Sequence, residues 1–256
     1  MNRLDPILAA TREEVARRRE AVPPPALGRR DPDDLRSLAE ALARPGLSVI
    51  AEHKRRSPSA GPIRADLALE DVVKAYERGG AAATSILTNG ASFGGSLDDL
   101  RAARGATALP LLRKDFIVDP YQVGESFAAG ADAILLIVAA LSDSALRSLF
   151  TAAQELGLNV LVEVHDEREL DIAVTLGAPV IGINNRDLTT LQVDIRRTFE
   201  LLPRVAGRAL VVSESGFRTR TQLDELARAG VDGVLIGEAL MRSPDVEAAC
   251  RALAVG

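Results

Sequence analysis

Residues 130–166, GADAILLIVAALSDSALRSLFTAAQELGLNVLVEVHD, place one amphipathic stretch between two apolar runs, a pattern that indicates the class of fold. Gly130 precedes the first run and Gly157 the second, as expected where a helix ends in the left-handed conformation that glycine adopts at little cost. Ser142 stands where its side chain can cap the intervening helix. The segment therefore predicts a strand, a helix and a second strand, the repeat that builds parallel sheets.

The same unit recurs along the chain. Three more glycines precede apolar runs: Gly80 before AAATSILT, Gly177 before APVIGI and Gly230 before VDGVLIG. Further strands are predicted at LSVIAE (47–52), LPLLRK (109–114) and ALVVSE (209–214), and helix starts at Asp119-Pro120, Ser142, Asp166, Asp194, Thr219 and Ser243-Pro244. Eight continuous apolar strands that alternate with helices predict an α/β protein with a closed (β/α)8 TIM barrel.

The length of 256 residues suits one such barrel, and no Gly/Ser-rich or purely charged linker divides it. We expect one domain over residues 1–256. Residues 1–45 form an N-terminal helical extension that packs on the barrel, and residues 46–256 form the barrel itself.

Composition excludes several classes of protein. The net charge of −5 argues against broad binding of nucleic acid, which requires a basic surface. The N-terminus has no apolar run long enough for a signal peptide or membrane span, so we expect a cytoplasmic protein without a membrane partner. Cys250 is the single cysteine, which precludes an intrachain disulfide and a thiolate metal cluster.

Neither histidine is in a spacing that predicts a metal site. His53 alternates with Glu52 and Lys54 and is expected to point towards the helix layer, whereas His165 lies where the chain turns into a helix. We interpret both as structural or solvent-facing. Cys250 is interpreted as a small residue that packs a helix rather than as a nucleophile.

Charged side chains stand at strand ends where a barrel interior is normally apolar. They are Glu52 and Lys54 after the first strand, Lys114, Glu163 and Glu214 at three others, and Asn184 and Arg186 at a further one. All fall at the carboxyl ends, where barrel enzymes place their sites. Ion pairs that merely plug the barrel are the alternative, but buried pairs rarely add net stability over apolar residues. We expect general acid–base chemistry instead.

Two small-residue turns predict a phosphate site. Ser213-Glu214-Ser215-Gly216 and Ile236-Gly237-Glu238 follow the seventh and eighth strands, whose loops commonly bind phosphate in barrels. Tight turns that need glycine only for backbone reasons remain the alternative. The loop Arg56-Ser57-Pro58-Ser59-Ala60-Gly61 is polar and rich in turn residues, and could fold over a ligand.

Eight segments occur in order between residues 49 and 241: IAEHKRRSPSAG, SILT…FGGS, LLRKDFIVDPYQ, ADAILLIV, VLVEVH, IGINNRDLTTL, VSESG and LIGEALM. Together they resemble the strand-end motifs of the indole-3-glycerol phosphate synthase family. The resemblance implies closure of the indole ring of 1-(2-carboxyphenylamino)-1-deoxyribulose 5-phosphate with loss of carbon dioxide and water, in tryptophan biosynthesis. It implies no cofactor and no metal. We expect a monomer, with weak association to other enzymes of the pathway left open.

Residue roles follow from the same resemblance. Lys114 resembles the general acid that protonates the ketone, and Glu163 its acid–base partner in dehydration. Lys54 resembles the residue that pairs with the substrate carboxylate, while Glu52 holds this lysine and takes part in proton removal. The family positions that orient the substrate are matched by Asn184, Arg186, Glu214 and Ser215, and those of the phosphate turns by Ser215, Gly216, Gly237 and Glu238. The loop that closes over the site is matched by Ser57. The apolar wall for the anthranilate ring is matched by Phe93, Phe116, Leu135 and Leu188.

Three residues depart from the family pattern. Asn89 stands where an acidic residue often follows the strand, His53 replaces an apolar residue, and Glu238 takes a place that is often Ser or Thr. Glu238 alters the phosphate site only if its side chain points inward, because a backbone N–H contact does not depend on the side chain.

Other activities share parts of this pattern. Phosphoribosylanthranilate isomerase would share the phosphate turns but is disfavoured because no cysteine lies near a strand end. A Schiff-base aldolase would use Lys54 or Lys114 as a nucleophile that borohydride traps. A non-catalytic phosphosugar-binding barrel would need the turns but not the acid–base cluster.

Overall fold

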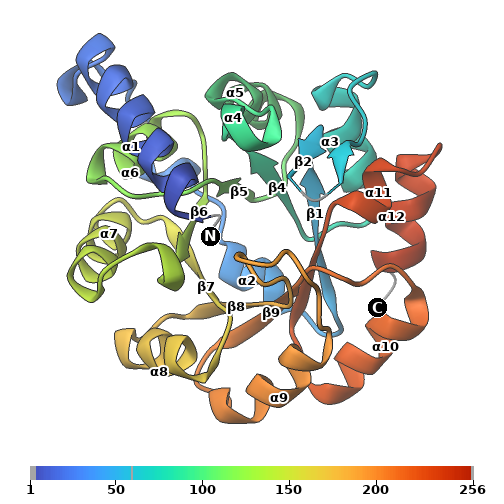
Figure 1. Ribbon diagram of the computed structural model, residues 1–256. Coiled ribbons are helices and arrows are strands. Elements are labelled where there is room, and N and C mark those ends of the chain that lie inside the picture. Colours follow the sequence, from blue (N-terminus) through green and yellow to red (C-terminus); the bar gives the residue numbers. More distant parts are fainter. Residues whose placement is uncertain (1–3, 59, 255–256) are drawn as a thin grey trace.

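The computed structural model describes residues 4–58 and 60–254, so Ser59 of the expected loop lies outside the described residues. Eight parallel strands close a barrel in the order β1-β10-β9-β8-β7-β6-β5-β4, which confirms the predicted fold (Figure 1). The strands are β1 (Ser48–His53), β4 (Ala83–Leu87), β5 (Leu111–Lys114), β6 (Ala133–Ile137), β7 (Asn159–Val164), β8 (Val180–Asn184), β9 (Leu210–Glu214) and β10 (Gly233–Ile236). A short antiparallel pair, β2 (Arg56–Ser57) and β3 (Gly61–Pro62), follows β1.

Helices surround this barrel. They are α3 (Leu69–Arg78), α4 (Gly90–Phe93), α5 (Leu97–Ala106), α6 (Pro120–Ala128), α7 (Asp143–Glu155), α8 (Glu167–Leu176), α9 (Arg196–Val205), α10 (Arg220–Ala229), α11 (Glu238–Met241) and α12 (Val246–Ala254). Short 3-10 turns are η1 (Pro24–Ala26), η2 (Pro32–Asp34) and η3 (Val138–Ala140). The five glycines predicted to end helices, Gly80, Gly130, Gly157, Gly177 and Gly230, all have positive φ. These predictions are confirmed.

Four predicted caps are also confirmed: Asp119, Ser142, Asp166 and Thr219 each accept a hydrogen bond from the first turn of the following helix. Two helix starts were wrong by one or two residues. Helix α9 begins after Ile195, although the Asp194 carboxylate accepts a bond from the Arg196 backbone N–H. Before α12 the Ser243 hydroxyl accepts from Asp245 N–H, and Asp245 instead accepts from Ala248 N–H. Asp and Ser side chains compete for such N–H groups, which makes the boundary ambiguous in sequence.

Alternation along each strand separates two apolar cores. On β7, Val160, Val162 and Val164 face outward and pack in the core beneath the helices. Leu161 faces inward and joins the core inside the barrel, and Glu163 continues that inward face at the carboxyl end. The inner core thus ends where the charged residues begin.

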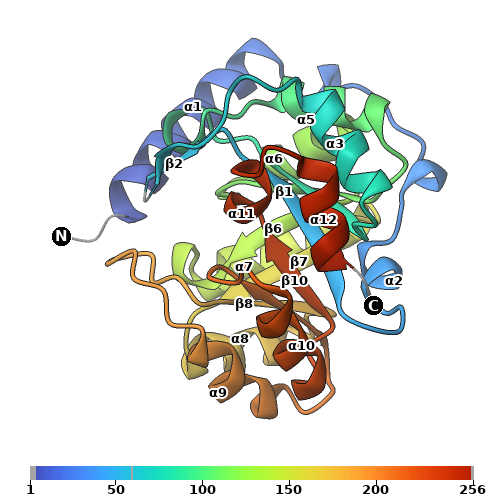
Figure 2. The same cartoon turned by 90° about the vertical axis from the view of Figure 1, so that its right-hand side faces the viewer.

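The two N-terminal helices lie towards opposite ends of the barrel (Figure 2). Helix α1 (Leu4–Ala21) contributes Leu4 and Leu8 to the same apolar cluster as Phe116 and Ile137, near the carboxyl ends of the strands. Helix α2 (Leu38–Leu42) inserts Leu38 and Leu42 into the barrel core from the other end. The extension therefore closes the amino-terminal end and partly roofs the mouth.

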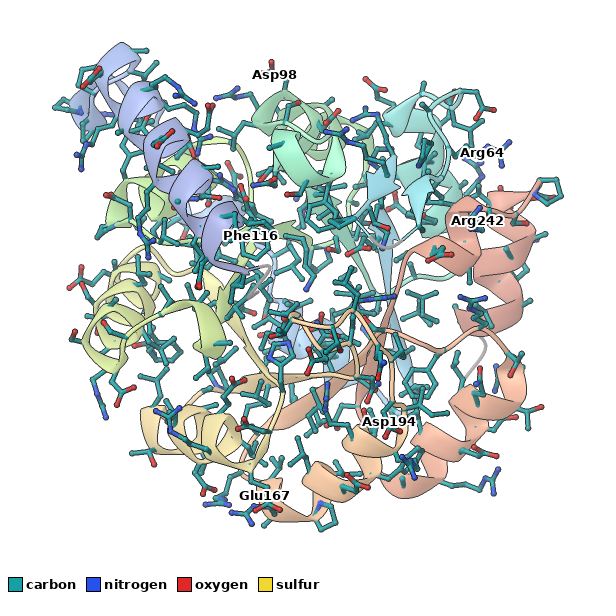
Figure 3. All side chains as sticks on the ribbon, viewed as in Figure 1. Arg64, Asp98, Phe116, Glu167, Asp194 and Arg242 are labelled. Carbon is teal, nitrogen blue, oxygen red and sulfur yellow. The ribbon has the colours of Figure 1, made fainter. Side chains whose placement is uncertain are left out.

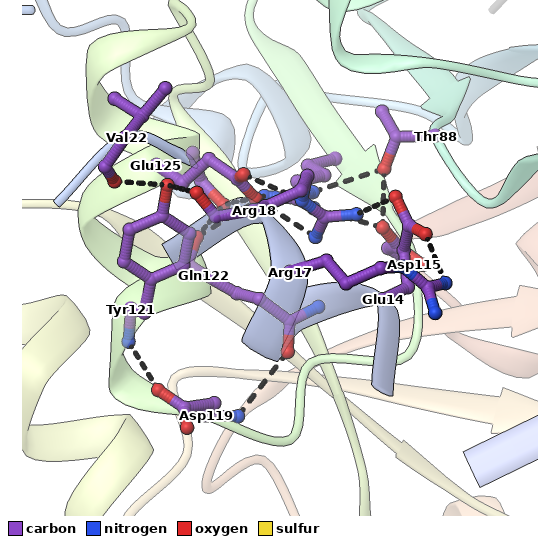
Figure 4. Close-up of polar contacts among 12 residues, drawn as sticks. Glu14, Arg17, Arg18, Val22, Thr88, Asp115, Asp119, Tyr121, Gln122 and Glu125 are labelled. Atoms are coloured by element: carbon purple, nitrogen blue, oxygen red, sulfur yellow. Dashed lines mark hydrogen bonds and ion pairs between the residues drawn. The ribbon is translucent and has the colours of Figure 1, made fainter. Parts of the chain in front are cut away.

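A buried ionic network joins α1 to the strand that carries Lys114 (Figure 4). Arg113, which is fully buried, donates to Glu125 at 2.9 Å and to Asp115 at 2.9 Å. Arg18 on α1 donates from Nε to the other oxygen of Glu125 at 2.8 Å. Because β5 alternates, the outward Arg113 binds the helix layer while the next residue, Lys114, points into the barrel.

Candidate active site

A cavity of about 650 Å³ opens at the carboxyl ends of the barrel strands. Every residue predicted to contribute to the site lines it: Glu52, Lys54, Ser57, Phe93, Lys114, Phe116, Leu135, Glu163, Asn184, Arg186, Leu188, Glu214, Ser215, Gly216, Gly237 and Glu238. The tertiary structure therefore brings together residues spread over more than 180 positions of the sequence.

Lys114 lies at the centre of the charged groups. Its Nζ donates to Glu163 Oε2 at 2.7 Å and to Glu214 Oε2 at 2.7 Å. The Lys114 side chain is 14% exposed, and each carboxylate is 2% exposed. Gly182 makes room for this contact, since a Cβ on the inward face of β8 would overlap Oε1 of Glu214. One ammonium group thus bridges two buried carboxylates.

Burial and charge act in opposite directions on these groups. Burial alone would lower the pKa of Lys114, but Glu163 and Glu214 outweigh it and raise that pKa well above its ordinary value. Burial raises the pKa of Glu163, but Lys114 and His165 reverse the effect and hold it well below the ordinary range. Burial raises the pKa of Glu214, and Glu163 adds to this against the opposing charge of Lys114. The two carboxylates therefore differ sharply in proton affinity, as pairs of acid–base groups in active sites do.

A second ion pair lies on the β1 side of the mouth. Lys54 Nζ donates to Glu52 Oε1 at 2.6 Å, with Glu52 inward on β1 and Lys54 one residue beyond the strand. A Cβ on Gly237 would lie 2.5 Å from the same Glu52 oxygen, so glycine is required there for close packing. The turn after β10 therefore packs closely against the Glu52 carboxylate.

Two amides organise the ends of β8 and β9. Asn184 donates from Nδ2 to Glu163 Oε1 at 3.1 Å and accepts from the Arg186 backbone N–H at 3.0 Å. Asn185 is fully buried, and its Nδ2 donates to the carbonyls of Glu214 and Ser215 at 3.0 and 3.1 Å. Sequence reasoning missed Asn185. The sequence did contain a signal, namely the second asparagine of IGINN. Strand alternation places its side chain outward, where it can form hydrogen bonds with the end of a neighbouring strand.

The turn after β9, one of the two predicted to bind phosphate, has an unusual backbone conformation. Ser215 has φ 68° and Gly216 φ 100°, and a Cβ on Gly216 would lie 2.7 Å from Val193 Cγ1. Such a turn exposes successive backbone N–H groups, a common way to bind an anion. Glu238 Oε1 accepts from Arg242 Nε at 3.0 Å and lies 3.9 Å from Arg218 NH2, so its charge is turned towards cations. Arg218 also lines the cavity and was missed in the sequence.

Apolar side chains form the opposite wall. Phe116 and Leu135 are buried in the inner core, and Phe93 and Leu188 pack against it from partly exposed positions. Figure 3 shows Phe116 beside the first turns of α1 above the ring of strands, whereas Asp98 and Glu167 lie at the rim of the molecule. Leu4 and Ile7 of α1 line the cavity as well, a contribution that the sequence analysis did not assign.

His165 is placed differently from its sequence interpretation. Its Nε2 lies 3.3 Å from Glu163 Oε1, and its Nδ1 lies 3.0 Å from Glu169 Oε2. Burial would lower the pKa of His165, but the two carboxylates raise it to about 9. A signal existed, because His165 lies one residue beyond β7 and two residues after Glu163, so continued strand alternation would place both side chains on the same side. His53 is buried outside the site as expected, and burial lowers its pKa to about 4.

Within the described part of the chain, no three His, Cys, Asp or Glu side chains are arranged to hold a metal ion. In residues 4–58 and 60–254 no helix has the length and apolar character needed to cross a membrane.

Comparison with known proteins identifies relatives across nearly the whole chain. The sequence profile of the family described as indole-3-glycerol phosphate synthase matches residues 4–253. Indole-3-glycerol phosphate synthase 2 of Streptomyces coelicolor is 51% identical over 82% of this chain and 81% of its own length. The indole-3-glycerol phosphate synthase of Mycobacterium ulcerans is 47% identical over 96% of this chain and 91% of its own.

Solved structures with little sequence similarity share the fold. A mutant tryptophan synthase α-subunit from Pyrococcus furiosus superposes with a TM-score of 0.63 at 16% identity, covering 80% of this chain and 97% of that one. A thiamine phosphate pyrophosphorylase from the same organism gives a TM-score of 0.62 at 18% identity, covering 85% and 96%. At such low sequence identity, these similarities support only the assignment of the barrel fold and not an activity.

Proposed function

The chain belongs to the indole-3-glycerol phosphate synthase family, and from this premise we propose how its residues carry out the reaction. The activity is a carbon–carbon lyase reaction of tryptophan biosynthesis, which closes the indole ring of 1-(2-carboxyphenylamino)-1-deoxyribulose 5-phosphate and releases carbon dioxide and water. The observation that carries the assignment of roles is the position of Lys114, bridged between Glu163 and Glu214 at the mouth of the cavity.

Lys114 acts as the general acid of ring closure. As the aromatic carbon that bears the carboxylate attacks the ketone carbon, Lys114 gives a proton from Nζ to the ketone oxygen. The developing oxyanion becomes a hydroxyl, and the carboxylate then leaves as carbon dioxide, which restores the aromatic ring. The neighbouring carboxylates keep Lys114 charged until the substrate arrives, and a general acid so placed contributes about 10²- to 10⁴-fold to the rate.

Dehydration follows at the same carbon. The hydroxyl leaves as water with one added proton, while the adjacent methylene loses one, and the indole double bond forms between the two carbons. Glu163 is the acid–base partner in this step, and Glu52 takes part in the proton removal. Both are buried beside a lysine, an arrangement that suits proton exchange in a site that excludes bulk water.

The remaining groups bind and orient the substrate. Lys54 pairs with the substrate carboxylate, and Asn184, Arg186, Glu214 and Ser215 orient the polar groups of the substrate. Backbone N–H groups of the turns at Ser215, Gly216, Gly237 and Glu238 hold the phosphate. Phe93, Phe116, Leu135 and Leu188 form the wall for the anthranilate ring, and Ser57 belongs to the loop that closes over it. No cofactor takes part in this scheme.

The direct test is incubation with the carboxyphenylamino sugar phosphate while indole absorbance and fluorescence are followed. The chain contains no tryptophan and only two tyrosines, so product indole emits against a low protein background. Continuous formation of indole fluorescence supports the assignment. Folded protein that gives no indole signal would refute it, and covalent modification of Lys114 by borohydride with a keto-sugar phosphate would point to an aldolase.

We further propose that the enzyme works as a cytoplasmic monomer, associating at most weakly with other enzymes of its pathway. Among the described residues, the exposed large apolar side chains are Val22 and Val193. Stable homodimers usually bury a much larger apolar patch. Light scattering during size-exclusion chromatography should give a mass near 27.1 kDa.

A further inference from the structure

A chain of three side chains runs from the active site to the outer helix layer. Glu163 on β7 faces the cavity, His165 follows two residues later, and Glu169 lies in the first turn of α8. The distances are 3.3 Å from Glu163 Oε1 to His165 Nε2 and 3.0 Å from His165 Nδ1 to Glu169 Oε2. The first is an ion-pair distance without good hydrogen-bond geometry, while the second is a hydrogen bond.

Glu169 holds the imidazole in place from two directions. Its Oε2 accepts the His165 backbone N–H at 2.7 Å as well as facing Nδ1. A carboxylate on one ring nitrogen fixes the orientation of the ring and directs the other nitrogen, here towards Glu163. The His165 and Glu169 side chains are each 11% exposed, so solvent does little to screen this arrangement.

Around Lys114 the site has two buried carboxylates but one ammonium group, so a second cation would stabilise the ionised carboxylates. Glu163 and Glu214 share the single ammonium of Lys114. The other oxygen of Glu163, Oε1, receives a neutral hydrogen bond from Asn184 and faces His165. Lys54 is paired with Glu52 instead. Within the cavity, the Lys114 ammonium pairs with both Glu163 and Glu214. His165 faces only Glu163 among the cavity carboxylates.

We propose that His165 is a positioning residue for the reaction: as an imidazolium braced by Glu169, it holds Glu163 ionised and oriented while Lys114 loses its charge. This proposal rests on the proposed function, since it concerns the moment when Lys114 has given its proton to the ketone. At that point the ammonium no longer balances Glu163, and His165 keeps the carboxylate in place for the dehydration. The raised pKa of His165 supports the charged form at neutral pH.

Titration of His165 tests the ion pair without any turnover. The chain has two histidines, so their ring resonances in NMR spectra can be assigned with the His165→Asn variant. His165 should titrate near pH 9 and His53 near pH 4. Glu163→Gln and Glu169→Gln should each lower the pKa of His165 by about one unit or more, because each removes one of the two facing carboxylates. Glu167→Gln, an exposed site on the same helix with a side chain 69% exposed, should leave it unchanged.

Kinetics test whether the ion pair matters for the reaction. His165→Asn should lower the single-turnover rate about tenfold at pH 7, equivalent to one pKa unit of lost electrostatic support, with KM changed less than about twofold. The wild-type rate should fall towards that of the variant as His165 loses its proton, so the two profiles should converge above pH 9. Glu169→Gln should reproduce part of the loss, and Glu167→Gln none of it.

Two results would overturn the proposal. One is a His165 that titrates near its ordinary value in the folded protein, because it would then be neutral at working pH. The other is a His165→Asn rate that stays below wild type by the same factor at every pH, which a structural defect alone would produce. Failure of the wild-type protein to form indole would instead count against the proposed function, while the titration would still decide whether the ion pair exists.

Discussion

Lys114 and Glu214 stand on strands β5 and β9, four places apart around the eight-strand barrel, yet Lys114 Nζ lies 2.7 Å from Glu214 Oε2. Strands so separated lie on opposite sides of the closed barrel, so their side chains meet only across its interior. Both are inward residues at carboxyl ends, and both are long enough to reach the axis. The contact exists because the sheet closes, and an open sheet of the same strands would leave the two groups far apart.

Replacement of Lys114 by Met should abolish ring closure and also lower the free energy of unfolding, because it leaves buried Glu163 and Glu214 without their shared cation; folding of the variant is therefore checked by circular dichroism. The methionine fills similar volume but has no proton to give, so we expect a fall in kcat of at least about 10²-fold. Binding of a substrate analogue should stay within about tenfold, a window of about 1.4 kcal/mol. Lys74→Met, at an exposed position of α3, is the control and should keep full activity. Retained turnover in Lys114→Met would remove this lysine from the mechanism.

Gly237→Ala should impair catalysis through Glu52. A Cβ at this position would lie 2.5 Å from Glu52 Oε1, so the carboxylate that pairs with Lys54 must move. We expect lower kcat and a higher KM, because the same turn is proposed to hold the phosphate. Gly105→Ala, on α5 with no atom near the added methyl, should be active and more stable by about 0.5–1 kcal/mol. Unchanged kinetics for Gly237→Ala would show that Glu52 has room to adjust.

Arg113→Leu should cost about 3–5 kcal/mol of unfolding free energy. The substitution leaves Asp115 and Glu125 buried without their shared cation, and removing one partner of a buried network carries this penalty. Chemical denaturation followed by circular dichroism measures it. Arg101→Leu removes an exposed pair with Asp98 and should change stability by less than about 1 kcal/mol. Similar losses in the two variants would contradict the role of the buried network.

Glu238→Ser should tighten binding of the phosphorylated substrate. The change removes a negative charge beside the turn proposed to hold the phosphate, and releases Arg242 and Arg218 from it. We expect KM to fall a few-fold at low ionic strength, with a smaller change in high salt because screening weakens such interactions. Glu247→Ser removes two comparable pairs, with Arg251 on α12 and Arg78 on α3, and should leave KM unaltered. An increase in KM for Glu238→Ser would indicate that this side chain binds the substrate.

Stability should depend on pH through His165. The pKa of this group is raised in the folded state to about 9 from an ordinary 6.5, so protonation stabilises the fold. This contribution is fully present below pH 6.5 and disappears as the pH rises through 9. The free energy of unfolding of the wild type should therefore decline between these values relative to that of His165→Asn. Parallel curves over this interval would exclude a charged His165 in the folded protein.

The order of elements could be predicted because local signals repeat. The glycines that end helices, the polar caps and the apolar runs each act over a few residues, so sequence alone placed all eight strands to within about two residues. Boundaries at α9 and α12 were less certain, because Asp194 and Ser243 accept from the N–H groups two residues on, as capping residues can, although neither is the residue directly before the helix.

The residues of the candidate site could also be anticipated, since ionisable groups at strand ends are costly unless they have a purpose. His165 and Arg113 were not anticipated in their roles. Both lie within two residues of a predicted site residue, Glu163 or Lys114. Their partners, Glu169 and Glu125, belong to helices α8 and α6, and no local sequence pattern specifies how these helices are oriented against the barrel. Arg218 and Asn185 were missed for a similar reason, because turn conformation decides what they reach.

Local patterns in the sequence were enough to predict the alternation of strand and helix, the inward face of each strand, and the charged groups that lie at the mouth of the barrel. Three features could be seen only in the folded chain: Lys114 is shared by Glu163 and Glu214, α1 and α2 lie towards opposite ends of the barrel, and His165 faces Glu163. The two groups of features differ in the sequence separation over which their causes act. Hydrogen-bonded turns and periodic burial act between near neighbours, whereas pairing of buried charges depends on barrel closure and helix packing, which bring distant residues within a few ångströms.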